Sequence, residues 1–215
     1  MARSCCMIAA VFIAIVAVFP ATKASAEEGQ WSRLAVAVPS QRNFVIPSPD
    51  RKKTIRIEGF DLTVVEGGLP VPGGVNISIL KPAEIAWAPD SKAFTITSSD
   101  GGSDGTWEVV VFLLEYERFT YYDPGKEAVL LFKQQYPCLD QLEPNVGAVR
   151  WLKESKHLLL ALEMPPAAAC EDRKAVRGYA VEANTGKVLK EYDRKKLMDE
   201  WGEYLGKRIV PDIAR

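Results

Sequence analysis

The chain has few of the side chains on which most catalytic and metal sites depend. Histidine occurs once in its 215 residues, as His157. A zinc site draws on several His or Cys ligands, and a nucleophilic triad needs a histidine beside a serine and an acid. The sequence also has no Gly-x-Ser-x-Gly elbow and no glycine motif of the phosphate-binding kind. We therefore expect no metal site, no cofactor and no catalytic role for His157.

Neither sign of charge is in excess. The chain has 27 basic and 28 acidic residues, a net charge of −1. Binding to nucleic acid or to an anionic membrane requires a basic stripe or tail, and neither is present. We expect no nucleic-acid partner.

The one long apolar run is too short to span a bilayer. It extends from Met7 to Phe19, about 13 residues, whereas a transmembrane helix needs ~20. Arg3 precedes it and Ala24-Ser25-Ala26 follow it, a pattern typical of a cleavable signal peptide. The alternative is a membrane anchor. We predict that residues 1–26 are a signal peptide and that residues 27–215 form one domain, periplasmic or secreted, with no membrane span.

Cysteine is scarce as well. Two of the four cysteines, Cys5 and Cys6, lie within the predicted signal. Cys138 and Cys170 remain, and an even pair in an oxidising compartment favours a disulfide. The alternative, half of a metal site, would need two further ligands.

What the sequence does contain is internal repetition. Each copy consists of a short apolar stretch, a turn with a carboxylate and a lysine, and a second apolar stretch, which together predict a hairpin. The turn acids Asp50, Asp90 and Glu154 should therefore occupy equivalent positions. The three copies are Val45–Ile57, Ile85–Thr97 and Val149–Ala161.

About four strands per copy are expected, in an all-β fold. With the turn Trp87-Ala88-Pro89-Asp90-Ser91-Lys92 between the first two strands, the copies resemble β-propeller blades of the Tol-type and WD-repeat kind. The resemblance covers roughly residues 43–192 and speaks to fold rather than activity. Three blades fall short of the four or more that close a propeller. We expect an open array of four-stranded antiparallel blades, or a two-sheet sandwich.

Three further elements are expected around the repeats. Residues Trp31–Val38 alternate enough to predict a strand, and Ala128–Lys133 is interpreted as the fourth strand of the second unit. Residues 193–205 have helical apolar spacing after Asp193, a possible cap, and predict one C-terminal helix.

An aromatic and charged segment lengthens the second unit. Aromatic side chains mixed with charge on a projecting element are typical of recognition surfaces. The alternative is an extended hairpin whose rings pack on the sheet. The candidate binding residues are Tyr116, Arg118, Phe119, Tyr121 and Tyr122.

These patterns favour an exported, non-catalytic module of the bacterial envelope that binds another protein, such as an inhibitor, an immunity protein or a component of an envelope complex. The alternative is a periplasmic hydrolase or lyase that acts on sugars or cell-wall fragments through clustered carboxylates. A polar pocket with two or more buried acids would favour the enzyme, and a flat aromatic surface would favour the binding module.

Overall fold

The protein consists of three antiparallel sheets and two α-helices in the residues that the computed structural model describes, 30–39, 43–71, 76–80, 82–101, 106–115 and 118–210. We call the sheets first, second and third by their order along the repeats. The first sheet contains β2 (Phe44–Pro47), β3 (Lys53–Glu58), β4 (Asp61–Glu66) and β5 (Leu69–Pro70), with β6 (Asn76–Ser78) also paired to β4. The second contains, in spatial order, β1 (Val36–Val38), β7 (Ala83–Trp87), β8 (Ala93–Ser99), β9 (Trp107–Glu115) and β10 (Arg118–Tyr122). The third contains β11 (Asn145–Leu152), β12 (His157–Glu163), β13 (Val176–Glu182) and β14 (Val188–Tyr192).

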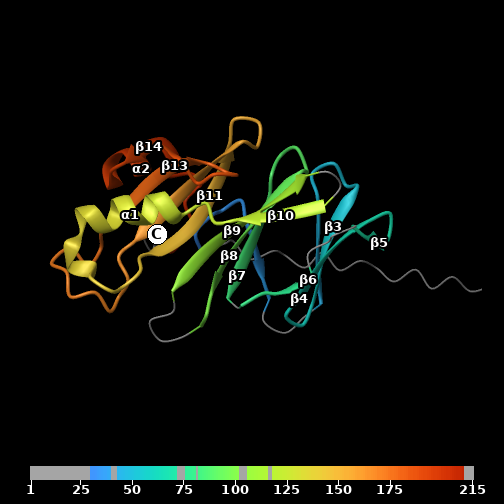
Figure 1. Ribbon diagram of the computed structural model, residues 1–215, viewed down its shortest axis with the longest axis horizontal. Helices are drawn as coiled ribbons and strands as arrows, with labels where there is room; N and C mark the ends of the chain where they lie inside the picture. The colour runs from blue at the N-terminus through green and yellow to red at the C-terminus, as the bar shows by residue number, and fades with distance from the viewer. Residues whose placement is uncertain are drawn as a thin grey trace, which may run out of the picture.

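The sheets form an open row of propeller-like blades with the second sheet in the middle (Figure 1). One apolar core, which includes Ile55 and Phe94, fills the space between the first and second sheets. Another, which includes Val111 and Leu160, lies between the second and third. Strand β9 supplies side chains to both cores, which explains why its sequence is a continuous apolar run rather than an alternating one. The expected all-β architecture is confirmed.

Successive sheets are joined by hydrogen bonds that repeat from one pair of sheets to the next. The indole N–H of Trp87 donates to the carbonyl of Ile46 at 3.2 Å, and that of Trp151 donates to the carbonyl of Ala86 at 3.2 Å. In the same way, the main-chain N–H of Asp50 donates to Ser91 Oγ, and that of Asp90 donates to Ser155 Oγ. The repeated turn thus joins neighbouring sheets as well as neighbouring strands.

The turn acids Asp50, Asp90 and Glu154 do lie in equivalent turns, as predicted: between β2 and β3, between β7 and β8, and between β11 and β12. Each aspartate accepts a hydrogen bond from the main-chain N–H two residues later, an Asx turn. The third turn differs because its residues 153–155 all have positive φ, with Lys153 at 36°. Proline is restricted to negative φ, which explains why the third copy has lysine where the other two have proline.

The C-terminal helix, α2 (Arg194–Trp201), is present but shorter than predicted. The carboxylate of Asp193 accepts a hydrogen bond from the N–H of Lys196 and caps the helix, as expected. Leu197 is fully buried against β13 and β14. This helix covers the outer face of the third sheet.

The prediction of a strand over Ala128–Lys133 is wrong, because the segment is part of a second helix, α1 (Lys126–Gln135), followed by the short 3-10 helix η1 (Pro137–Leu139). Ala128 and Phe132, four residues apart, are both fully buried and lie on one helix face. A short apolar run of this length is compatible with a strand or with part of a buried helix, and periodicity over so few residues does not separate the two.

The N-terminal strand is also shorter than predicted, because only Val36–Val38 is β1 and the residues before it pack against the C-terminal segment. The N–H of Gly206 donates to the carbonyl of Trp31, and the N–H of Arg33 donates to that of Tyr204. Trp31 is fully buried over Gly147, where a Cβ would lie only 1.9 Å from the indole ring. We call this antiparallel contact between residues 30–33 and 204–208 the terminal clasp.

Candidate functional site

An apolar cleft of about 760 Å³ lies between α1 and the start of β9. Trp107, Val109 and Val146 are buried side chains that line it. Val129 and Leu130 of α1 form a facing wall, and Leu130 is 56% exposed. A leucine that is exposed beside a concave apolar surface is the kind of residue that binding partners cover.

Helix α1 forms this wall because its two faces differ. Ala128 and Phe132 face the third sheet, and the opposite face, with Leu130, is left toward the cleft. The helix begins after Pro124, which cannot continue the β10 ladder, and Asp123 Oδ1 accepts a hydrogen bond from the N–H of Gly125 at 2.9 Å.

Both ends of α1 are fixed to the third sheet. Near its start, Glu127 Oε2 accepts a hydrogen bond from the N–H of Val188 at 3.0 Å. Near its end, Gln135 Nε2 donates to Glu191 Oε2 at 3.1 Å. The wall of the cleft is therefore held in place by β14 as well as by its own buried face.

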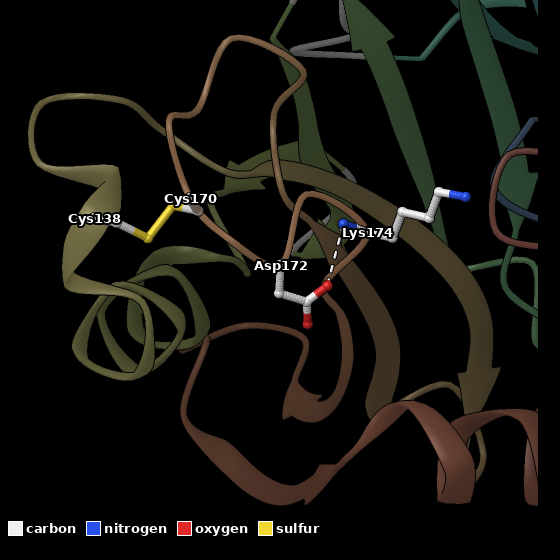
Figure 2. Close-up of a disulfide and its surroundings, with 4 residues drawn as sticks. All are labelled: Cys138, Cys170, Asp172 and Lys174. Atoms are coloured by element: carbon white, nitrogen blue, oxygen red, sulfur yellow. Dashed lines mark hydrogen bonds between the residues drawn. A yellow bond between two sulfur atoms is a disulfide. The ribbon is translucent and has the colours of Figure 1, made fainter.

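A disulfide fixes the segment that follows α1. Cys138 of η1 is bonded to Cys170 in the loop between β12 and β13, with Cα atoms 5.4 Å apart, and the predicted pairing is confirmed (Figure 2). Beyond Cys170 the loop is turned by a hydrogen bond from the N–H of Lys174 to Asp172 Oδ1 at 3.3 Å. Pro137, next to the bridge, lines the cleft.

Charged side chains surround the apolar lining. Lys133 and Glu143, which both line the cleft, form an ion pair at 2.8 Å. Lys126 then remains beside two acids, Glu108 and Asp123. The charge left around the opening is slightly negative.

The candidate aromatic segment, by contrast, does not present its rings on one surface. Phe119 is buried and packs edge-to-face on Phe94 with ring centroids 5.3 Å apart. Tyr121 is 73% exposed, and its ring lies 6.3 Å from that of Phe112. Phe119 therefore belongs to the core between the first and second sheets, and Tyr121 remains available to a partner.

The other members of the segment lie at the edge of the second sheet. The hydroxyl of Tyr122 donates to Glu115 Oε2 at 3.0 Å, and this hydrogen bond raises the pKa of the phenol. Arg118 is exposed at the start of β10. Tyr116 lies outside the described residues. The structure thus places Tyr121 and Arg118 at the surface, while the binding role of the five residues stays a prediction.

His157 lines a second, smaller concavity of about 430 Å³. It lies across the β12–β13 ladder from Glu182, whose Oε2 accepts a hydrogen bond from Thr185 Oγ1. Glu182 is the one acid in the lining of this concavity, and it is half-buried. The two concavities described here do not join two buried acids.

The buried acid of the described residues is Glu84 on β7, which is 2% exposed and lines neither concavity. Its Oε2 accepts a hydrogen bond from the N–H of Trp31 at 3.2 Å, and its Oε1 has no partner in the described part of the chain. Burial raises the pKa of Glu84 to about 8, against the opposing effect of the main-chain N–H groups of residues 30–32. Its position ties the terminal clasp to the second sheet, which is a structural role.

No three His, Cys, Asp or Glu side chains in the described ranges lie close enough together to hold a metal ion. Neither helix, within the same ranges, has the length and apolar content needed to cross a bilayer. Comparisons with protein-family models, with curated proteins and with solved structures found no match to the chain.

Sequence reasoning missed the cleft because it missed α1. Two signals were available: Asp123-Pro124 before the segment, which favours a helix start, and the spacing of Ala128 and Phe132. The strand interpretation placed residues 128–133 in the ladder of the second unit and so left no wall opposite β9.

Proposed function

We propose that the protein is an exported, non-catalytic module of the bacterial envelope that binds another protein, and that the cleft between α1 and β9 is its binding site. The observation that carries this proposal is the exposed Leu130 beside an apolar cleft whose walls are fixed by hydrogen bonds and a disulfide. A preformed apolar concavity with a polar rim is typical of binding sites, because little conformational entropy is lost on association.

An inhibitor, an immunity protein and a component of an envelope complex all fit this proposal. The disulfide supports an oxidising compartment, periplasmic or extracellular. A polar pocket with two or more buried acids would favour the hydrolase or lyase alternative, and neither described concavity contains two buried acids.

The test uses the chain from residue 27 to 215, immobilised and exposed to a periplasmic extract, with bound proteins identified by mass spectrometry. Leu130→Glu places a charge in the cleft without disturbing the core, because the side chain is largely exposed. The matched control is Leu189→Glu on β14, which is also exposed, at 43%, and lies outside the cleft.

A protein retained by the wild type and by Leu189→Glu, but lost from Leu130→Glu, supports the proposal. Retention by all three would show that the cleft is not the binding site. Thermal unfolding of both variants should match that of the wild type, so that loss of binding reflects the surface and not the fold.

A further inference from the structure

Strand β9 is covered by β10 along only part of its length. The register between the two strands runs from the Glu115–Arg118 pair to the Val111–Tyr122 pair. After Tyr122 the chain leaves the sheet through Asp123 and Pro124 and enters α1. The first residues of β9, which line the cleft, therefore have β8 on one side and, within the described part of the chain, no strand on the other.

The main-chain groups of Val109 face this open side. The N–H of Leu114 donates to the carbonyl of Lys92 at the end of the β8–β9 ladder, so the even-numbered residues of β9 are bonded toward β8. The odd-numbered residues are then directed toward β10. Continuing the β9–β10 register would place residue 124 opposite Val109, but residue 124 is a proline without an N–H and lies outside the strand.

One of the open groups is already satisfied by a side chain. The N–H of Trp107 donates to Asn145 Oδ1 at 3.0 Å. The carbonyl of Trp107 and both the N–H and the carbonyl of Val109 have no partner on this side among the described residues. Their alternation at two-residue spacing is the pattern that one strand of a ladder presents to the next.

The geometry points to strand addition: an extended segment of a partner protein pairs with residues 106–110 of β9 inside the cleft. This inference rests on the proposed function and specifies the chemistry of the partner. Side chains of an added strand that stand beside Trp107 and Val109 would meet the apolar lining formed by Val129, Leu130 and Val146, so these positions call for apolar residues.

The charge at the cleft specifies the partner residue that lies between these two apolar positions. Glu108 is exposed on β9 and lines the opening, and the unpaired charge around it is negative. A lysine or arginine directly opposite Glu108 would form a favourable cross-strand pair. A second copy of this chain, paired antiparallel about the same residue, would place Glu108 opposite itself, which is destabilising. The structure therefore favours a different partner, one whose extended segment has a basic residue between two apolar residues.

The probe for this inference is the synthetic peptide acetyl-Lys-Thr-Val-Lys-Val-Thr-Lys-amide. Its sequence is the same in both directions, so it presumes neither parallel nor antiparallel pairing. Its central lysine stands opposite Glu108 when its valines flank Trp107 and Val109. The control peptide has glutamate at the centre.

Amide hydrogen exchange followed residue by residue by NMR is the direct measurement, on the chain from residue 27 to 215. At saturating peptide, we expect exchange at the N–H of Val109 to slow by about tenfold or more, because that N–H gains an acceptor. The N–H of Val110 faces β8 and serves as the internal reference, with no change expected. The Glu108→Lys variant should bind the peptide about fivefold more weakly, whereas Glu203→Lys, an exposed acid outside the cleft, should bind it normally.

Each other outcome overturns the inference. If the peptide shifts the methyl signals of Leu130 but leaves Val109 exchange unchanged, the cleft binds without strand addition, and the proposed function stands. If the peptide does not bind at millimolar concentration, strand addition is wrong, and the capture experiment with Leu130→Glu judges the proposed function separately. If Val109 becomes protected on raising the protein concentration alone, the occupant is a second copy.

Discussion

The buried carboxyl group of Glu84 should make the free energy of unfolding depend on pH, and replacing Glu84 by glutamine should remove most of that dependence. In the unfolded chain this group has an ordinary pKa near 4.5, and in the fold burial raises its pKa to about 8. Between these values the folded protein holds a proton that the unfolded chain has lost. The free energy of unfolding must therefore fall as pH rises through this window.

The magnitude follows from the width of the window. Each unit of pKa difference corresponds to about 1.4 kcal/mol, so between pH 5 and pH 8 the contribution of Glu84 falls by about 4 kcal/mol. Glutamine keeps an oxygen that accepts the N–H of Trp31 and carries no charge to desolvate. The Glu84→Gln variant should gain on the wild type as pH rises, and the difference should be largest near pH 8 and above.

The assay is urea unfolding at half-unit steps from pH 5 to pH 9. The matched control is Glu58→Gln, an exposed acid at the end of β3, whose curve should run parallel to that of the wild type. If the Glu84→Gln curve is also parallel to the wild type, the carboxyl group is not desolvated in the fold and this reasoning is refuted.

Three further predictions concern packing and covalent structure. Thiol titration of the denatured, unreduced protein from residue 27 to 215 should find no free cysteine, and two free thiols would contradict the disulfide. Reducing the disulfide should lower the free energy of unfolding by about 4 kcal/mol, the loop-closure value for a sequence separation of 32. Phe119→Ala should lower the free energy of unfolding by about 3 to 5 kcal/mol because the ring is buried, whereas Tyr121→Ala should change it by less than about 0.5 kcal/mol. Equal effects of the two substitutions would contradict the burial of Phe119 and the exposure of Tyr121. Gly147→Ala should lower the melting temperature sharply, because its methyl group would occupy the space of the Trp31 ring, and a melting temperature equal to the wild type would contradict the packing of the clasp.

The repeats could be predicted from sequence because their signals are local. Asp50 and Asp90 each accept a hydrogen bond from the main-chain N–H two residues later, so the turn is encoded within a few positions. The strands on either side are identified by apolar stretches of ordinary strand length. The central hairpin of each of the three sheets follows from these two signals.

The cleft could not be predicted in the same way, because it depends on contacts between distant segments. Whether residues 126–135 form a helix or a strand is decided by the buried face that Ala128 and Phe132 share with the third sheet. The open side of β9 exists because β10 stops at Tyr122, a boundary that the apolar pattern does not mark. Phe119 and Tyr121 are two residues apart and share one face of β10, so strand alternation does not separate the buried ring from the exposed one.

The terminal clasp sets the order in which the chain can complete its fold. Trp31 lies among the first described residues, yet its partners include Gly147 and the segment that ends near Arg208. Contacts between residues so distant in sequence form late, because the loop between them must be closed first. Residues 30–33 therefore cannot complete their hydrogen bonds until residues 204–208 have been made.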